Sequence, residues 1–146
     1  MMHAKAHGWD RKVCLLCLGV AASGCAEVRG GAVEARWFLR NGQGEIKDCV
    51  ELKIQSVRCI VDPVAGGTDP CATEPSCSFD CDRTLSGAVT GFVIPEGSYA
   101  ISLGLVDTDG QLLTPQDGVT APAPVVRQVR EGQVTGLNVN LIIVNR

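Results

Sequence analysis

The sequence predicts an all-β protein, folded as a single antiparallel β-sandwich of about seven strands. Three observations lead to this prediction. Apolar residues recur at every second position in several short runs, which is the period of a strand with one buried face. Turns rich in glycine and proline separate these runs. No stretch after residue 25 shows the period of an amphipathic helix.

The N-terminal segment, residues 1–24, has the composition of an export signal rather than of a folded domain. A part with three basic residues precedes an apolar stretch from Val13 to Ala22, and small residues follow. This order is typical of a secretory signal peptide. The apolar stretch is shorter than the roughly 20 residues that a membrane-spanning helix needs. We therefore expect residues 1–24 to be removed.

The end of this segment, Ala22-Ser23-Gly24-Cys25, resembles the bacterial lipobox, although leucine is commoner at the position of the alanine. The resemblance implies that Cys25 is lipidated and becomes the new N-terminus, with residues 25–31 as a tether. It also implies a place in the bacterial cell envelope, with the membrane bound through the lipid anchor at Cys25. Ala26 rather than an aspartate follows the cysteine, and by resemblance to sorted lipoproteins this favours the outer membrane.

The sandwich is expected over residues 32–146, and its first strand follows the tether directly. Alternate residues of this strand are apolar: Val33, Ala35, Trp37 and Leu39. Glycines and an asparagine in Asn41–Gly44 then provide a tight turn. Such a run is typical of a strand with one face in the core and one in solvent.

The second extended run, from Val50 to Val61, changes parity near Ser56. Apolar residues occupy even positions before Ser56 and odd positions after it. A β-bulge has this effect, because one extra residue turns every later side chain to the opposite face. The parity shift therefore predicts that Cys59 points into the core.

Residues 62–82 lack a strand period and are rich in proline, cysteine and acidic residues. We expect a long loop held by disulfides, of the kind that often has a function. Its carboxylates are potential calcium ligands: Asp62, Asp69, Glu74, Asp80 and Asp82. Their spacing matches no EF-hand, and Asp107–Gly110 begins a calcium loop without its later ligands. We interpret the former as a solvated acidic loop and the latter as a hairpin turn.

Strands return after this loop. The expected runs are 88–94, 99–105, a short return strand at 111–114, 125–130 and 134–144, with a proline-containing loop at 116–124. In the last run, four apolar side chains are expected to face inward, opposite Asn138 and Asn140: Leu137, Val139, Leu141 and Ile143. Apolar neighbours flank Trp37 and Tyr99, so both are expected in the core rather than at a ligand.

The cysteines predict two disulfides and one free thiol. Removal of Cys14 and Cys17 with the signal, and lipidation of Cys25, leave five: Cys49, Cys59, Cys71, Cys77 and Cys81. Disulfides form in the oxidising compartment of an exported protein. Cys71–Cys77 closes a short flexible loop, Cys49–Cys81 ties both ends of the long excursion to the sandwich, and Cys59 stays free. The main alternative pairs Cys59 with Cys81 and leaves Cys49 free.

Two stretches of the chain carry a family resemblance. Ile94–Leu103, followed by Asp107–Gly110, resembles the signature of prealbumin-like sandwich domains, which include carboxypeptidase-regulatory-like modules. Trp37-Phe38-Leu39 and Cys49 resemble features of small envelope lipoproteins of gliding and predatory bacteria. The resemblance implies a prealbumin- or immunoglobulin-like sandwich, noncatalytic, whose loops and edges serve binding or scaffolding.

Composition excludes several function classes. Both histidines, His3 and His7, lie in the removed segment, which excludes Ser-His-Asp and Cys-His catalysis and histidine-containing zinc sites. Loss of that segment lowers the 13 basic and 16 acidic residues to 10 and 15, so the mature chain is acidic. No stretch concentrates lysine or arginine, so we expect no nucleic acid partner. We also expect no cofactor and no metal.

Three functions remain in view. The leading one is a noncatalytic envelope lipoprotein whose sandwich serves binding or assembly at the membrane surface, with an envelope protein or peptide as partner. The second is a protease inhibitor or ligand-recognition protein that uses the stapled loop 62–82, because a constrained loop loses less entropy on binding. The third is a hydrolase that works with carboxylates alone, for which a deep pocket with paired carboxylates would be the sign.

Overall fold

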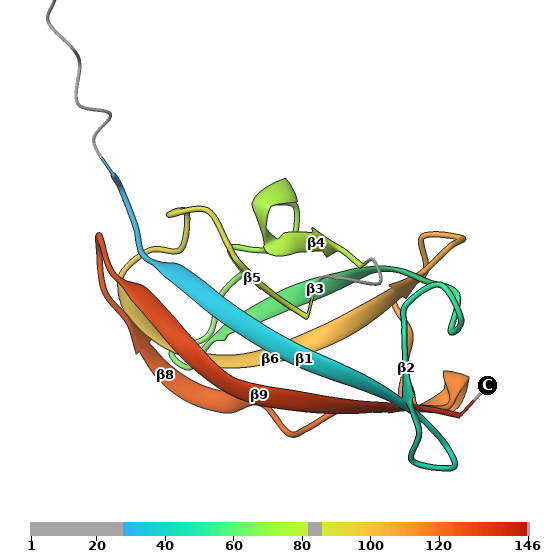
Figure 1. The fold of residues 1–146 in the computed structure, drawn as a ribbon. Coiled ribbons are helices and arrows are strands. Elements are labelled where there is room, and N and C mark those ends of the chain that lie inside the picture. Colours follow the sequence, from blue (N-terminus) through green and yellow to red (C-terminus); the bar gives the residue numbers. More distant parts are fainter. Residues whose placement is uncertain (1–27, 82–85, 146) are drawn as a thin grey trace, which may run out of the picture.

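The computed structural model describes residues 28–81 and 86–145, and these form nine strands and no α-helix. The strands are β1 (Ala32–Asn41), β2 (Ile46–Lys47), β3 (Ile54–Pro63), β4 (Ser78–Asp80), β5 (Gly87–Val89), β6 (Gly97–Asp107), β7 (Val119–Thr120), β8 (Val125–Val129) and β9 (Val134–Val144) (Figure 1). Two single turns of 3₁₀ helix are η1 (Pro75–Cys77) and η2 (Pro115–Asp117). The all-β prediction is therefore confirmed, and the described part has more strands than the seven expected.

The strands form two sheets around one core. One has the order β2-β1-β9-β7, with β5 also paired to β1, and the other has the order β4-β3-β6-β8. Buried apolar residues of both sheets meet in a single cluster, which is consistent with a β-sandwich. Most strand pairs are antiparallel, but β1 and β9 run parallel, side by side in Figure 1. The expectation of a purely antiparallel sandwich is wrong at this pair, because the chain passes through the other sheet before its last strand returns beside its first.

Strand β1 has the alternation that its sequence predicts. Its inward residues are buried: Val33, Ala35, Trp37 and Leu39. The Trp37 ring stacks on Phe79 of β4, with ring centroids 5.8 Å apart and planes 9° apart. Phe79 lies in the stretch for which the sequence predicts only loop. Residues 78–80 instead form an edge strand beside β3, because Phe79 sits between two polar residues and fills the core under Trp37.

The predicted bulge in β3 is present. The register of β3 against β6 shifts between Ile54 and Ser56, and two successive residues, Ser56 and Val57, are both buried. Beyond the shift the odd positions face the core, and the Cys59 side chain is 0% exposed. The prediction that Cys59 points inward is confirmed.

The chain before β3 differs from the prediction, since the turn ahead of Ile54 replaces the expected start of the strand. The Asp48 carboxylate accepts the Glu51 N–H at 2.8 Å and the Glu51 carboxylate accepts the Asp48 N–H at 3.1 Å, as in a helical capping box. The turn closes when the N–H of Ile54 donates to the carbonyl of Cys49 at 2.8 Å. Lys53 has a φ of 54° at the closing position, a conformation that favours glycine.

The facing predicted for β9 is wrong after Leu137. Leu137 packs against the core, but Val139 and Leu141 are exposed, and Ile142 and Val144 are buried instead. The register against β1 explains the difference, because the single residue Ala35 of β1 lies opposite two residues of β9, Leu137 and Asn138. This bulge turns every later side chain of β9 over, as the first bulge does in β3.

Three further predicted segments are shorter or more structured than expected. The run 88–94 is a strand only as far as Val89, after which the Thr90 hydroxyl accepts the Val33 N–H at 2.9 Å in place of a backbone carbonyl. The return strand at 111–114 is reduced to a single bridge between Val106 and Leu112. The loop 116–124 overlaps η2 and contains β7.

Two disulfides hold the excursion between β3 and β5, and they are the two pairs predicted from the sequence. Cys49 bonds to Cys81 with 5.7 Å between their Cα atoms, and Cys71 bonds to Cys77 with 5.5 Å. Cys59 is free and buried. The alternative pairing of Cys59 with Cys81 is therefore absent from this structure.

Candidate functional site where the N-terminal segment joins the sheets

The N-terminal segment enters the fold between two loops that hold it by backbone hydrogen bonds. On one side the N–H of Gly31 donates to the carbonyl of Ile94 at 2.8 Å, and the N–H of Ile94 donates back at 3.2 Å. On the other side the carbonyl of Gly30 accepts the N–H of Gly132 at 2.8 Å, and the N–H of Ala32 donates to Gln133 at 2.9 Å. The point at which the chain leaves the sandwich is thus fixed from both sides.

Two adjacent glycines make this close approach feasible. A Cβ at Gly31 would overlap the carbonyl oxygen of Arg130 and the side chain of Val129. Gly30 has a φ of 153°, and a Cβ there would lie 2.9 Å from the carbonyl oxygen of Ile94. Both positions therefore require the absence of a side chain. Gly30-Gly31 before the first alternating run is the sequence signal for this junction, although the sequence pattern alone predicts only a tether there.

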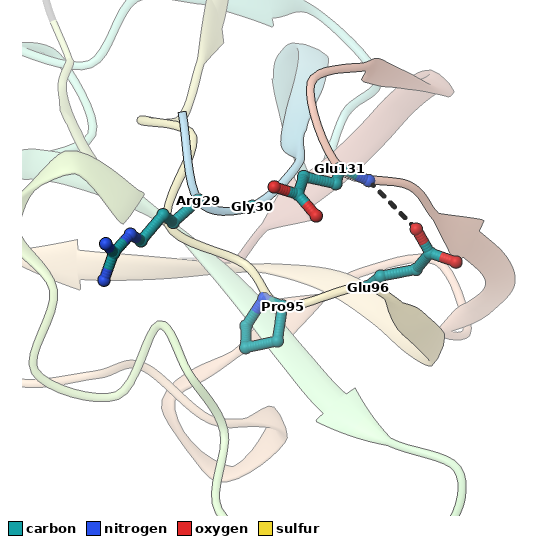
Figure 2. A pocket seen from close by; sticks show the side chains of 5 residues that line it. All are labelled: Arg29, Gly30, Pro95, Glu96 and Glu131. Carbon is teal, nitrogen blue, oxygen red and sulfur yellow. Dashed lines mark hydrogen bonds between the residues drawn. The ribbon is translucent and has the colours of Figure 1, made fainter. Parts of the chain in front are cut away.

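A surface hollow with a volume of about 380 Å³ lies beside this junction. Figure 2 shows the residues that line it: Arg29, Gly30, Pro95, Glu96 and Glu131. Glu96 comes from the turn before β6 and Glu131 from the turn between β8 and β9, and the Glu131 N–H donates to Glu96 Oε2 at 3.4 Å. The Arg29 side chain points away from both glutamates (Figure 2). None of these side chains is predicted as a site residue from the sequence.

The hollow combines two carboxylates with one guanidinium, a set that can hold a polar group by hydrogen bonds. Arg29, Glu96 and Glu131 are all exposed to solvent. A carboxylate pair used for acid–base catalysis needs an environment that separates its two pKa values, and burial is the usual means. The geometry here is that of a wet surface hollow rather than the deep pocket that would indicate a hydrolase.

The other aromatic and amide candidates have structural roles in this fold. Trp37 lies in the core, and the hydroxyl of buried Tyr99 donates to the carbonyl of Pro95 at 2.9 Å. Burial raises the pKa of Tyr99 above its ordinary value. The Asn140 amide donates to the carbonyls of Arg36 and Asn138, at 3.2 and 2.8 Å, so it links β9 to the neighbouring strand.

Two carboxylates of the acidic loop bond to the loop's own backbone. Asp69 accepts the Cys71 N–H at 2.7 Å, and Glu74 accepts the Ser76 N–H at 3.2 Å. Asp62 and Asp80 are exposed, and Asp82 lies outside the described residues. Within residues 28–81 and 86–145, no three potential ligands are grouped so that they could hold a metal ion. In the turn at 107–110, Asp107 accepts two backbone N–H groups, each at 3.0 Å.

The free thiol of Cys59 lies between the sheets. Burial, and secondarily the charge of Asp69, raises its pKa to about 12. A thiol with such a pKa stays protonated at neutral pH, whereas the thiolate is the form that reacts as a nucleophile or binds metals. Cys59 thus packs as a small apolar side chain.

The signal segment and the lipidation residue Cys25 lie outside the described residues, as do Cys14, Cys17, His3 and His7. In the part of the chain that the structure describes, no helix is both long and apolar enough to span a membrane. Comparison with protein families, with curated proteins and with solved structures found no match to this chain. The sequence and the geometry therefore carry the functional argument.

Proposed function

We propose that this protein is a lipid-anchored protein of the bacterial cell envelope, a noncatalytic sandwich that serves binding or assembly at the membrane surface. The observation that carries the proposal is Ala22-Ser23-Gly24-Cys25 after a basic and an apolar segment. Two disulfides support it, because stable disulfides are typical of exported proteins. We also propose a prealbumin-like topology for the two sheets.

The junction at Gly30 and Gly31 gives the anchor a structural counterpart. A tethered domain needs a fixed point where the tether leaves it, and backbone hydrogen bonds on both sides of the chain provide one. Four residues, Ala26 to Arg29, then lie between the lipidated cysteine and Gly30. We propose the outer membrane as the site of anchoring and an envelope protein or peptide as the partner.

Substitution of the lipidation residue tests this function. Cys25→Ser should abolish incorporation of radiolabelled palmitate, because serine lacks the acceptor sulfur, and should leave uncleaved precursor or an unanchored product. Cys17→Ser is the matched control, since it lies upstream of the proposed cleavage point and should leave labelling unchanged. A wild-type protein that takes up no palmitate would contradict the proposal.

A recognition role for loop 62–82 is the second candidate. Val64 to Thr68 are all exposed, and Arg58 donates to the Cys71 carbonyl at 3.2 Å, next to the Cys71–Cys77 disulfide. An exposed stretch on a constrained base loses less entropy on binding than a free one. Inhibition of at least one member of a peptidase panel, lost on reduction of the disulfides, would support this role.

A further inference from the structure

The end of the sandwich at the N-terminal junction has exposed apolar side chains as well as the hollow. Val28 is 46% exposed, Phe92 39% and Val93 36%. Phe92 and Val93 directly precede Ile94, whose backbone pairs with Gly31, and Val28 lies two residues before Gly30. Single exposed apolar residues are ordinary on protein surfaces, but these three surround the point where the tether leaves.

The length of the tether limits the distance between this end and the anchor. Five Cα-to-Cα steps lead from Cys25 to Gly30, and an extended chain spans at most about 3.4 Å per step, or about 17 Å in all. The lipidated cysteine sits at the surface of the bilayer, since its acyl chains are in the hydrocarbon. The fixed exit at Gly30 and Gly31 therefore holds the 92–95 segment close to the headgroups.

The chemistry of this end suits a lipid surface. Aromatic and aliphatic side chains gain free energy at the boundary between headgroups and acyl chains, where interfacial segments bury about 5–10 Å of depth. The hollow is lined by Arg29, Glu96 and Glu131, and Arg130 precedes Glu131 in the chain, so this end carries basic as well as acidic side chains. Contact of this kind does not require anionic lipid.

We propose that this end of the sandwich rests on the bilayer that holds the anchor, with the Phe92 and Val93 side chains in its interface. The inference depends on the proposed function, because the anchor sets the distance. It gives the sandwich a defined orientation, with the tether end on the lipid and the far end, where β1 and β9 finish, directed away from it.

Tryptophan quenching in vesicles tests this orientation. Lipidated mature protein, residues 25–146, with Phe92→Trp is placed in phosphatidylcholine vesicles whose acyl chains carry bromine, and its emission is compared with that in unbrominated vesicles. We expect at least ~2-fold quenching of the added tryptophan, because it would sit at the depth that interfacial side chains reach. Val93→Trp is a second probe of the same surface.

Phe38→Trp is the matched control. Phe38 is also an exposed phenylalanine, at 46%, but it faces outward from β1 about 20 Å further along the strand than Ala32. We expect no quenching at position 38, and the wild type supplies the background from buried Trp37. Near-ultraviolet circular dichroism of each variant checks that the fold is intact.

The outcomes separate the inference from the function on which it rests. If the protein floats with the vesicles, the anchor stands. The orientation is then overturned by any of three results: quenching only at position 38, equal quenching at positions 38 and 92, or quenching at neither. Protein that neither carries lipid nor floats overturns the proposed function and the orientation together.

Discussion

At the residue scale, the most unusual backbone position is Lys53. It takes a left-handed conformation, with φ 54°, to close the turn that Asp48 and Glu51 begin. A residue with a Cβ is sterically strained in this conformation, and glycine is not. Glycine is also more flexible in the unfolded chain, which cancels part of the stability gained by removing the strain. Lys53→Gly should therefore raise the free energy of unfolding by about 0.5–1 kcal/mol in urea melts. Lys53→Ala, which keeps the Cβ, should change it little, and a stability loss in the glycine variant would contradict this account.

Because of Cys59, the free energy of unfolding should fall as the pH rises through the alkaline range. Its pKa is raised from 9.0 to about 12, so its contribution is complete below pH 9 and is lost as pH rises toward 12. From pH 8 to pH 10 the wild type should lose about 1 kcal/mol more unfolding free energy than Cys59→Val, which is similar in volume and does not titrate. Parallel pH profiles of the two proteins in chemical denaturation would contradict burial of the thiol.

At the element scale, the junction between the N-terminal segment and the two sheets depends on Gly31. Gly31→Ala places a methyl group against the Arg130 carbonyl and the Val129 side chain, and should lower the free energy of unfolding by about 2–3 kcal/mol. Gly136→Ala in β9 is the control, because nothing lies within 4 Å of a Cβ there. Thermal melts of the two variants should differ clearly, and equal stability would mean that the loops around Gly31 yield at little cost.

The two disulfides should contribute unequally. Cys49–Cys81 spans 32 positions of sequence and Cys71–Cys77 spans 6. In the chain-entropy account, the longer loop gains more from closure, by about 1.5 kcal/mol. A double serine variant at Cys49 and Cys81 should be less stable than one at Cys71 and Cys77 by about that amount in denaturant melts. The reverse order would show that packing around Cys71 and Cys77 outweighs loop entropy.

The two bulges show what the sequence can and cannot predict about these elements. In β3, polar residues separate the apolar ones, so the change of parity at Ser56 is visible in the sequence and Cys59 is placed correctly. In β9, both faces end in apolar residues, so hydrophobicity does not reveal which face is inward. Asn140 contributed to the wrong facing predicted for β9. Its polarity alone predicts an exposed side chain, but it is half-buried and its amide donates to two carbonyls.

At the scale of the whole molecule, the fold class and both disulfides follow from the sequence, because strand period, turns and cysteine spacing are local properties. The pairing of the first strand with the last is a long-range property that no local pattern encodes. The hollow at the junction was missed for the same reason, since its residues come from three separate parts of the chain. Gly30-Gly31 is the one sequence feature that indicates this junction. Its significance is evident only when the loops that pack against these two glycines are known.

The parallel pair of β1 and β9 also determines how this molecule would respond to force. A load applied through the N-terminal segment would act on the start of β1, and β9 ends at the opposite end of the same pair (Figure 1). Tension between a membrane at one end and a partner held at the other would slide the two strands along each other. In that shear geometry the backbone hydrogen bonds share the load together, whereas a hairpin pulled from its open end breaks them one by one. If the proposed anchor is present, the first and last strands would together resist a load applied between it and the far end of the domain.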